Sequence, residues 1–197
     1  MTEPSTAPAT PAGEERPLRA DARRNYQRLL AAAASAFAEY GADAPLDDIA
    51  KRAGVGSGTL YRHFPTRQAL LEAVYRGQVE ELCARADELL ASQSPGEALG
   101  NWLRAMAAYA TTKRGMREVI GKDSEVNRYC RDLIRTAGDK LLGGAQESGE
   151  VRADASRDDL FKFVHAISVA TEQSPDGPEQ TDRLITMVMD GLRATPR

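Results

Sequence analysis

The stretch from Leu46 to Phe64, LDDIAKRAGVGSGTLYRHF, decides the fold, because it predicts two short helices joined by a tight turn. In its first half, apolar residues recur at the three- and four-residue steps of a helix that ends near Ala53. Gly54 follows at the position where many helices end in a residue with a left-handed backbone conformation. Glycine adopts this conformation at little cost because it has no Cβ. In the second half, Leu60 and Phe64 give the next helix an apolar inward face. The stretch therefore predicts a helix-turn-helix.

The other side of the second helix carries short polar residues near its start, followed by a tyrosine and an arginine: Ser57, Gly58, Thr59, Tyr61 and Arg62. A helix of this kind can press closely against the major groove of DNA. The Arg62 guanidinium has the paired donors that suit guanine, so we expect it to read a base, with a solvated surface arginine as the alternative.

Further motifs surround this stretch at fixed spacing. A long helix ends in Phe37-Ala38-Glu39-Tyr40-Gly41, the first motif helix holds Asp48-Ile49-Ala50, and Gly58-Thr59-Leu60-Tyr61-Arg62-His63-Phe64 is followed by Ala69-Leu70-Leu71. In these residues the chain from about Leu18 to Leu71 resembles the N-terminal domain of the TetR family of transcriptional regulators. It departs from the family at Ala44-Pro45-Leu46, where many relatives carry a Ser or Thr that touches a phosphate.

The resemblance implies a set of DNA contacts. Tyr61 and His63 are expected to reach phosphates or sugars, and Arg67 stands where relatives place a phosphate-binding lysine. Thr59 could touch a thymine methyl group or a phosphate, and Gly58 permits close backbone approach. The expected DNA-binding residues are Ser57, Gly58, Thr59, Tyr61, Arg62, His63 and Arg67.

The net charge of −3 is distributed unevenly in a way that favours DNA binding. Between Arg16 and Arg67 there are nine Lys and Arg against five Asp and Glu, whereas the rest of the chain carries more acids than bases. A basic head on an acidic body attracts phosphate locally without indiscriminate adsorption. No run of 18 apolar residues suggests a membrane span, and residues 1–18 have no signal-peptide core, so we expect a cytoplasmic protein.

Helical periodicity continues to the end of the chain, and no segment alternates as a strand would. We expect an all-α protein with about nine helices, the first from Asp21 to Tyr40 and a short separate one near Arg114–Ile120. The expected organisation is a disordered Pro-rich arm over 1–18, a three-helix DNA-binding head over 19–66, and a helical-bundle domain for effector binding and dimerisation over 67–197.

The body holds candidates for two further sites, both weighed against simple core packing. The family typically has a ligand cavity between these helices, and its candidate lining residues here are Trp102, Met106, Tyr109, Tyr129, Cys130, Phe161 and His165. The family resemblance also favours a four-helix dimer interface built from the last two helices of each protomer. Its candidate residues are Leu160, Val164, Ile167, Leu184, Ile185, Val188 and Leu192.

Signs of an enzyme or of a metal site are absent from the sequence. His63 and His165 are the only histidines and lack metal-ligand spacing, and neither a GxSxG elbow nor a Walker loop occurs. Cys83 and Cys130 are read as reduced, mostly buried thiols. We therefore expect no catalytic residues, no cofactor and no metal. The predicted function is that of a homodimeric repressor, released from a near-palindromic operator by a small-molecule effector. An activator of the same fold remains an alternative, as does a small-molecule binder or enzyme with a vestigial motif.

Overall fold

The computed structural model of the chain describes residues 15–121 and 123–194, with side chains placed from 21 to 110, at 119–121 and from 123 to 194. Within these ranges the protein is all-helical, as predicted, apart from one isolated bridge between Val151 and Arg193. The elements are α1 Glu15–Tyr40, the 3-10 turn η1 Gly41–Asp43, α2 Leu46–Arg52, α3 Ser57–His63, α4 Arg67–Ser92, α5 Pro95–Ile120, α6 Glu125–Glu147, α7 Arg157–Thr171 and α8 Gly177–Leu192.

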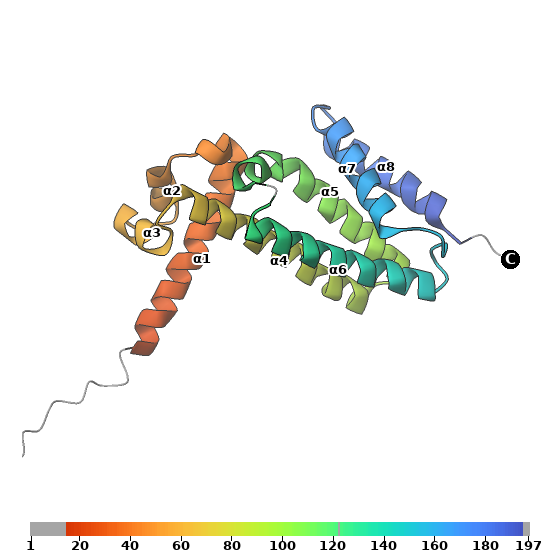
Figure 1. Cartoon of the computed structure of the whole chain (residues 1–197), viewed down its shortest axis with the longest axis horizontal. Coiled ribbons are helices and arrows are strands. Elements are labelled where there is room, and N and C mark those ends of the chain that lie inside the picture. The colour runs from red at the N-terminus through yellow and green to blue at the C-terminus, as the bar shows by residue number, and fades with distance from the viewer. Residues whose placement is uncertain (1–14, 122, 195–197) are drawn as a thin grey trace, which may run out of the picture.

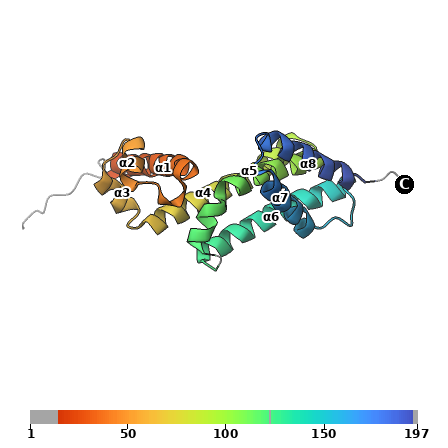
Figure 2. The same cartoon turned by 90° about the horizontal axis from the view of Figure 1, so that it is seen from above.

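The helices α1, α2 and α3 gather at one end of the molecule, and α4 leads from this head into the body (Figures 1 and 2). In the body, α4, α5 and α6 pack on one another, while α7 and α8 pack against each other and against α5. The long helix α5 therefore lies at the centre of the bundle. None of the helices in the described ranges combines the length and the apolar character needed to cross a bilayer.

Two apolar cores hold this arrangement together. The first is formed by α1, α2, α3 and the first half of α4, and it also takes in Ile120, Val126 and Cys130 from the α5–α6 end of the body. The second fills the rest of the body around Trp102, which is fully buried and donates its indole N–H to the Leu82 carbonyl at 2.9 Å. Because the first core includes residues of α5 and α6, the head is packed directly onto the body.

Side-chain caps fix where several helices begin. The hydroxyls of Thr66, Ser124 and Ser156 accept hydrogen bonds from the backbone N–H groups three residues later, at the starts of α4, α6 and α7. Ser94 and Glu97 form a reciprocal pair before α5, as expected for a capping box. The predicted start of this helix at Ser94-Pro95 is thereby confirmed.

The helix boundaries differ from the sequence prediction at two places. There are eight α-helices in the described ranges, not nine, because α5 runs without a break through the position where a separate helix near Arg114 was expected. Gly115 is the weakest helix former in that stretch, and one glycine in a helix costs only about 1 kcal/mol. In addition, α1 begins at Glu15 and not at Asp21, with Pro17 in its first turn, where proline is tolerated. Of the predicted disordered arm, residues 1–14 lie outside the described residues.

Candidate DNA-binding surface and ligand pocket

The turn between α2 and α3 has the geometry predicted from the sequence. Gly54 has a φ of 66°, in the left-handed region, and its N–H donates to the Lys51 carbonyl at 3.1 Å. The Val55 N–H bonds the Ala50 carbonyl at 3.0 Å, which closes the turn. Leu60 and Phe64 are buried in the head core. As a result, the opposite side of α3 faces solvent.

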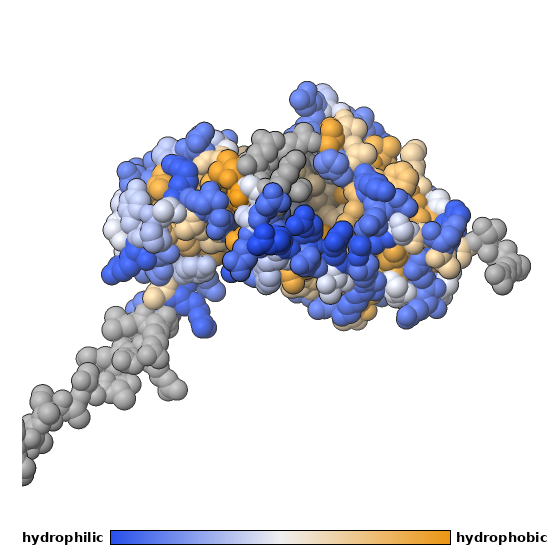
Figure 3. Space-filling model, in the orientation of Figure 1, coloured by the Kyte–Doolittle hydropathy of each residue, from blue (hydrophilic) through white to orange (hydrophobic). Residues whose placement is uncertain are grey.

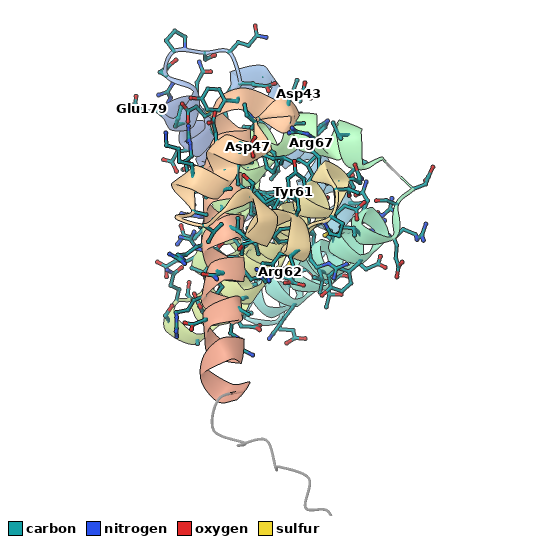
Figure 4. All side chains as sticks on the ribbon, turned by 90° about the vertical axis from the view of Figure 1, so that its left-hand side faces the viewer. Asp43, Asp47, Tyr61, Arg62, Arg67 and Glu179 are labelled. Carbon is teal, nitrogen blue, oxygen red and sulfur yellow. The ribbon has the colours of Figure 1, made fainter. Side chains whose placement is uncertain are left out.

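The outward face of α3 carries exposed Tyr61 and Arg62, and the Tyr61 side chain is 49% exposed. Figure 4 looks onto this end of the molecule and shows both residues on its surface, with Arg67 and Asp47 nearby. The guanidinium of Arg62 donates one hydrogen bond along the helix, to the Thr59 hydroxyl at 3.3 Å. Gly58 is exposed as well. The Tyr61 phenol and the Arg62 guanidinium are thus both exposed on the outward face of α3.

Ser57, at the start of α3, is hydrogen-bonded within the head. Its hydroxyl donates to Asp47 Oδ1 at 2.7 Å, which ties the first turn of α3 to the first turn of α2. The carboxylate of Asp47 would repel a phosphate placed beside Ser57. Ser57 therefore has a clear structural role, and a phosphate would have to displace this bond to use its hydroxyl.

His63 lies at the contact between α3 and α1 and is partly buried. Its ring meets the edge of Tyr26 with 5.9 Å between ring centroids, and Tyr26 also lies 5.2 Å from Phe64. The sequence reasoning did not single out Tyr26, which is 38% exposed. Its position on α1, facing the end of α3, depends on how the two helices pack and has no local sequence signal.

Arg67 begins α4 and holds the connection between α1 and α2. Its Nη1 donates to the backbone carbonyls of Ala42 and Ala44, at 3.0 and 2.5 Å. The other nitrogens of the guanidinium make no hydrogen bond or ion pair with the described residues. Arg67 therefore has an architectural role in the head, to which a phosphate contact could be added.

A pocket of about 520 Å³ opens in the body between α4, α5, α6 and α7. Figure 3 shows a hollow on this face of the molecule, with strongly hydrophilic residues along one side of it. Four of the residues expected to line a cavity line this pocket: Met106, Tyr109, Phe161 and His165.

Three other expected lining residues lie elsewhere. Trp102 and Cys130 are fully buried in the two cores and do not reach the pocket. Tyr129 is on the outer surface, where its hydroxyl donates to Glu80 at 3.1 Å and its ring lies 5.3 Å from the Arg76 guanidinium. The reason is rotational: Tyr129 lies on the side of α6 that faces the outer surface of α4.

Polar residues that the sequence reasoning missed complete the pocket. The Tyr75 hydroxyl donates to Asn127 Oδ1 at 3.3 Å, and the Asn127 side-chain amide donates to the Gly121 carbonyl at 3.0 Å. At the border are four charged residues of α6 and α7: Arg131, Arg135, Asp158 and Lys162. The four-residue spacing of the two arginines, with Ile134 between them, is the sequence signal that could have placed them on one side of α6.

The outer face of α7 and α8 differs from the predicted dimer surface. Leu160, Val164, Ile167 and Ile185 are buried within the protomer, so they are not available to a partner. Leu184, Val188 and Leu192 are partly buried. The apolar residues that face solvent are Phe163, Val169 and Met187, which are 53%, 43% and 68% exposed. Phe163 and Met187 also line a groove of about 390 Å³ between α7 and α8.

The thiols of Cys83 and Cys130 are protonated at neutral pH. Burial raises the pKa of the Cys83 thiol and that of the Cys130 thiol to about 11. Among the described residues, no cluster of His, Cys, Asp and Glu could hold a metal ion.

Comparison with known proteins finds two family models that match this chain. Residues 29–74 match the family model of bacterial regulatory proteins of the tetR family, and residues 94–194 match that of the SbtR-like transcriptional regulator C-terminal domain. The TetR transcriptional regulator SCO0520 from Streptomyces coelicolor is 44% identical, with a TM-score of 0.77 over 86% of this chain and 99% of its own.

Two other relatives are similar to this chain over most of their own length. A TetR transcription regulatory protein from Mycobacterium vanbaalenii is 36% identical, with a TM-score of 0.74 over 90% of this chain and 100% of its own. The HTH-type transcriptional repressor KstR2 from Mycobacterium tuberculosis is 30% identical over 69% of this chain and 74% of its own. With an exposed recognition helix on a matching scaffold, the chain belongs to the TetR family and is a DNA-binding transcriptional regulator.

Proposed function

We propose that the protein is a homodimeric repressor that binds a near-palindromic operator and leaves it when a small molecule occupies the pocket of the body. The observation that carries the DNA-binding part is the outward face of α3, where Tyr61 and Arg62 stand exposed while Leu60 and Phe64 anchor the helix. Repression is proposed because the related KstR2 is named a repressor. Since the operator is chromosomal DNA, the proposed place of action is the cytoplasm.

The proposed DNA contacts divide by role. Arg62 reads a base in the major groove, because it has the free donors for a guanine edge. Tyr61 and His63 position the helix on phosphates or sugars, and Thr59 and Gly58 let the start of α3 approach closely. Arg67 adds a phosphate contact to its bonds with the Ala42 and Ala44 carbonyls, and Ser57 contributes through the first turn of α3. The proposed head spans 19–66, and the proposed effector and dimerisation domain spans 67–197.

Dimerisation is proposed through the outer face of α7 and α8. Phe163, Val169 and Met187 put large apolar side chains into solvent there, and burying them would stabilise an assembly. A twofold axis through this face would pair equivalent surfaces and present two heads to one side. Two recognition helices could then enter successive major grooves about 34–36 Å apart, or somewhat more.

The pocket between α4, α5, α6 and α7 is the proposed effector site. Its volume of about 520 Å³ lies within the range of about 300–1,000 Å³ that is usual for small-molecule sites. It is lined by Tyr75 of α4, the helix whose first residue, Arg67, bonds backbone carbonyls of the head. A ligand that favours one position of α4 would change the spacing of the two heads and thereby weaken operator binding.

The test is binding of the purified protein to labelled DNA from its own promoter region, measured by fluorescence anisotropy against a scrambled duplex of equal length. We expect binding to the promoter DNA to be at least 1,000-fold tighter at physiological salt, the usual order of specific over non-specific affinity (~10³–10⁷). Equal affinity for both duplexes would contradict the proposal. A reporter gene whose expression fell upon deletion of the regulator would contradict repression alone.

A further inference from the structure

The interior of the α4–α7 pocket is built for an apolar group. Its wall is formed by a thioether, aliphatic chains and aromatic rings, contributed by Met106, Ile134, Phe161, Val164 and Tyr109. A strongly polar ligand such as a sugar would lose its water on entering, and the polar groups of Tyr75 and Asn127 are already hydrogen-bonded to each other and to the Gly121 carbonyl. The part of a ligand that enters the pocket is therefore expected to be apolar.

The mouth of the pocket has the opposite character, since cations outnumber carboxylates there. Among the described lining residues, Arg131 and Arg135 of α6 and Lys162 of α7 accompany one acid, Asp158, which the charges of Arg135 and Lys162 stabilise in its ionised form. Asp158 is bound by Arg157, which lies outside the pocket, at 2.9 Å, and that bond is the main reason why the pKa of its carboxyl is lowered. Asp158 thus stays ionised and already has a cation beside it.

The two arginines of α6 differ from the other charged groups of the mouth. Lys162 pairs with Asp159 at 3.1 Å, whereas Arg131 and Arg135 have no hydrogen bond or ion pair with any residue that the structure describes. Four residues apart on a helix, they lie one turn from each other on the same side. Two guanidinium groups with unused donors at the mouth of an apolar pocket form a receptor for an anionic head group.

We infer that the effector is an amphipathic anion, with an apolar body in the pocket and a carboxylate or phosphate head between Arg131 and Arg135. This inference rests on the proposed function only in naming the occupant an effector, because the binding chemistry follows from the pocket itself. A cationic ligand would need a free carboxylate at the mouth, and the one carboxylate among the described lining residues is held by Arg157.

The experiment measures direct binding by titration calorimetry, with four probes that share one ten-carbon chain, each below its micelle concentration. Decanoate and decyl phosphate carry the two possible anionic heads, decanol is neutral, and decyltrimethylammonium is a cation. We expect at least one anion to bind ten times more tightly than decanol, and the cation to bind more weakly than decanol. The better anion identifies the head group.

Varying the chain length of the probe tests the apolar interior of the pocket, and varying the salt concentration tests its charged mouth. Each CH₂ group removed from the better anion should weaken binding about fourfold, as follows from about 0.8 kcal/mol per buried CH₂. Raising the salt concentration to 0.5 M should reduce the advantage of the anion over decanol, because the arginines are exposed.

Substitutions test whether Arg131 and Arg135 bind the anionic head group. Arg131→Gln and Arg135→Gln should each weaken anion binding at least fivefold and leave decanol binding unchanged. Arg128→Gln is the matched control, since it removes the same charge from an exposed position of α6 that does not line the pocket. It should change neither affinity.

The inference is overturned if decanol or the cation binds as tightly as both anions, if neither anion binds, or if Arg128→Gln weakens anion binding as much as the other two variants do. Operator binding is measured without any ligand, so its failure would contradict the proposed function and not the ligand class. Likewise, an anion that binds through Arg131 and Arg135 but leaves the DNA complex intact would contradict only the proposed release.

Discussion

Replacing Met187 or Phe163 with glutamate should break the proposed dimer without unfolding the protomer. Burying a whole Met or Phe side chain contributes about 1.5–3 kcal/mol, and the Met187 side chain is still 68% exposed in the protomer. Its complete burial against a partner would thus contribute about 1–2 kcal/mol. Each residue occurs twice in a twofold interface, so the loss is about 2–4 kcal/mol per dimer, which raises the dissociation constant about 30- to 900-fold.

The assay is sedimentation equilibrium, with circular dichroism and a thermal melt to verify that each variant folds. Val119→Glu is the matched control, because Val119 is 49% exposed, lies near the end of α5 and does not line the groove between α7 and α8. We expect this control to remain dimeric and the two variants to become folded monomers with weakened operator binding. If Met187→Glu and Phe163→Glu both keep the wild-type dissociation constant, the outer face of α7 and α8 is not the interface.

Other expected outcomes concern the head and the buried thiols. Tyr61→Phe should weaken binding to every DNA sequence alike and lower the salt slope by about one unit if a phosphate contact is lost, and an unchanged slope would exclude that contact. Arg62→Ala should cost about 1–3 kcal/mol and relax the preference at one base of each half-site; selection from random DNA that returned the wild-type motif would exclude base reading. Arg67→Ala should lower the melting temperature even without DNA, because two backbone carbonyls lose a charged donor, at about 1–3 kcal/mol; a protein as stable as the wild type would contradict this architectural role. With a pKa raised to about 11 by burial, the Cys130 thiol should stay protonated at pH 8, so maleimide should label the folded protein far more slowly than the urea-unfolded protein, and equal rates would show that the thiol is accessible.

The helix-turn-helix could be predicted from the sequence because each of its determinants acts locally. Gly54 supplies a left-handed backbone directly after α2, and Leu60 and Phe64 lie one helical turn apart on the buried side of α3. The start of α5 was predictable for the same reason, since Ser94 and Glu97 satisfy backbone groups within one turn of each other. In such segments the sequence neighbours of a residue are also its neighbours in space.

The pocket and the outer face of the body could not be predicted so well, because their helices carry apolar residues on more than one side. On α7, Leu160 and Val164 pack inward, while Phe163 faces solvent. Periodicity alone marks all of these residues as candidates and does not say which side meets α5. On α6 the same ambiguity placed Tyr129 in the pocket, although its hydroxyl bonds Glu80 on the outer surface of α4. Only the packing of the helices resolves such cases.

The proposed effector site is connected to the DNA-binding head by helix α4 and by the apolar core that α4 shares with the head. Tyr75 lines the pocket, and it lies two turns along α4 from Arg67, whose guanidinium holds the carbonyls before α2. Through Asn127, Tyr75 is also joined to the Gly121 carbonyl at the end of α5, and both α4 and this end of α5 contribute to the core of the head. A closely packed core transmits a displacement and does not absorb it. We therefore expect a ligand that shifts α4 at Tyr75 to move the head. If this movement weakens DNA binding by some factor, bound DNA must weaken ligand binding by the same factor.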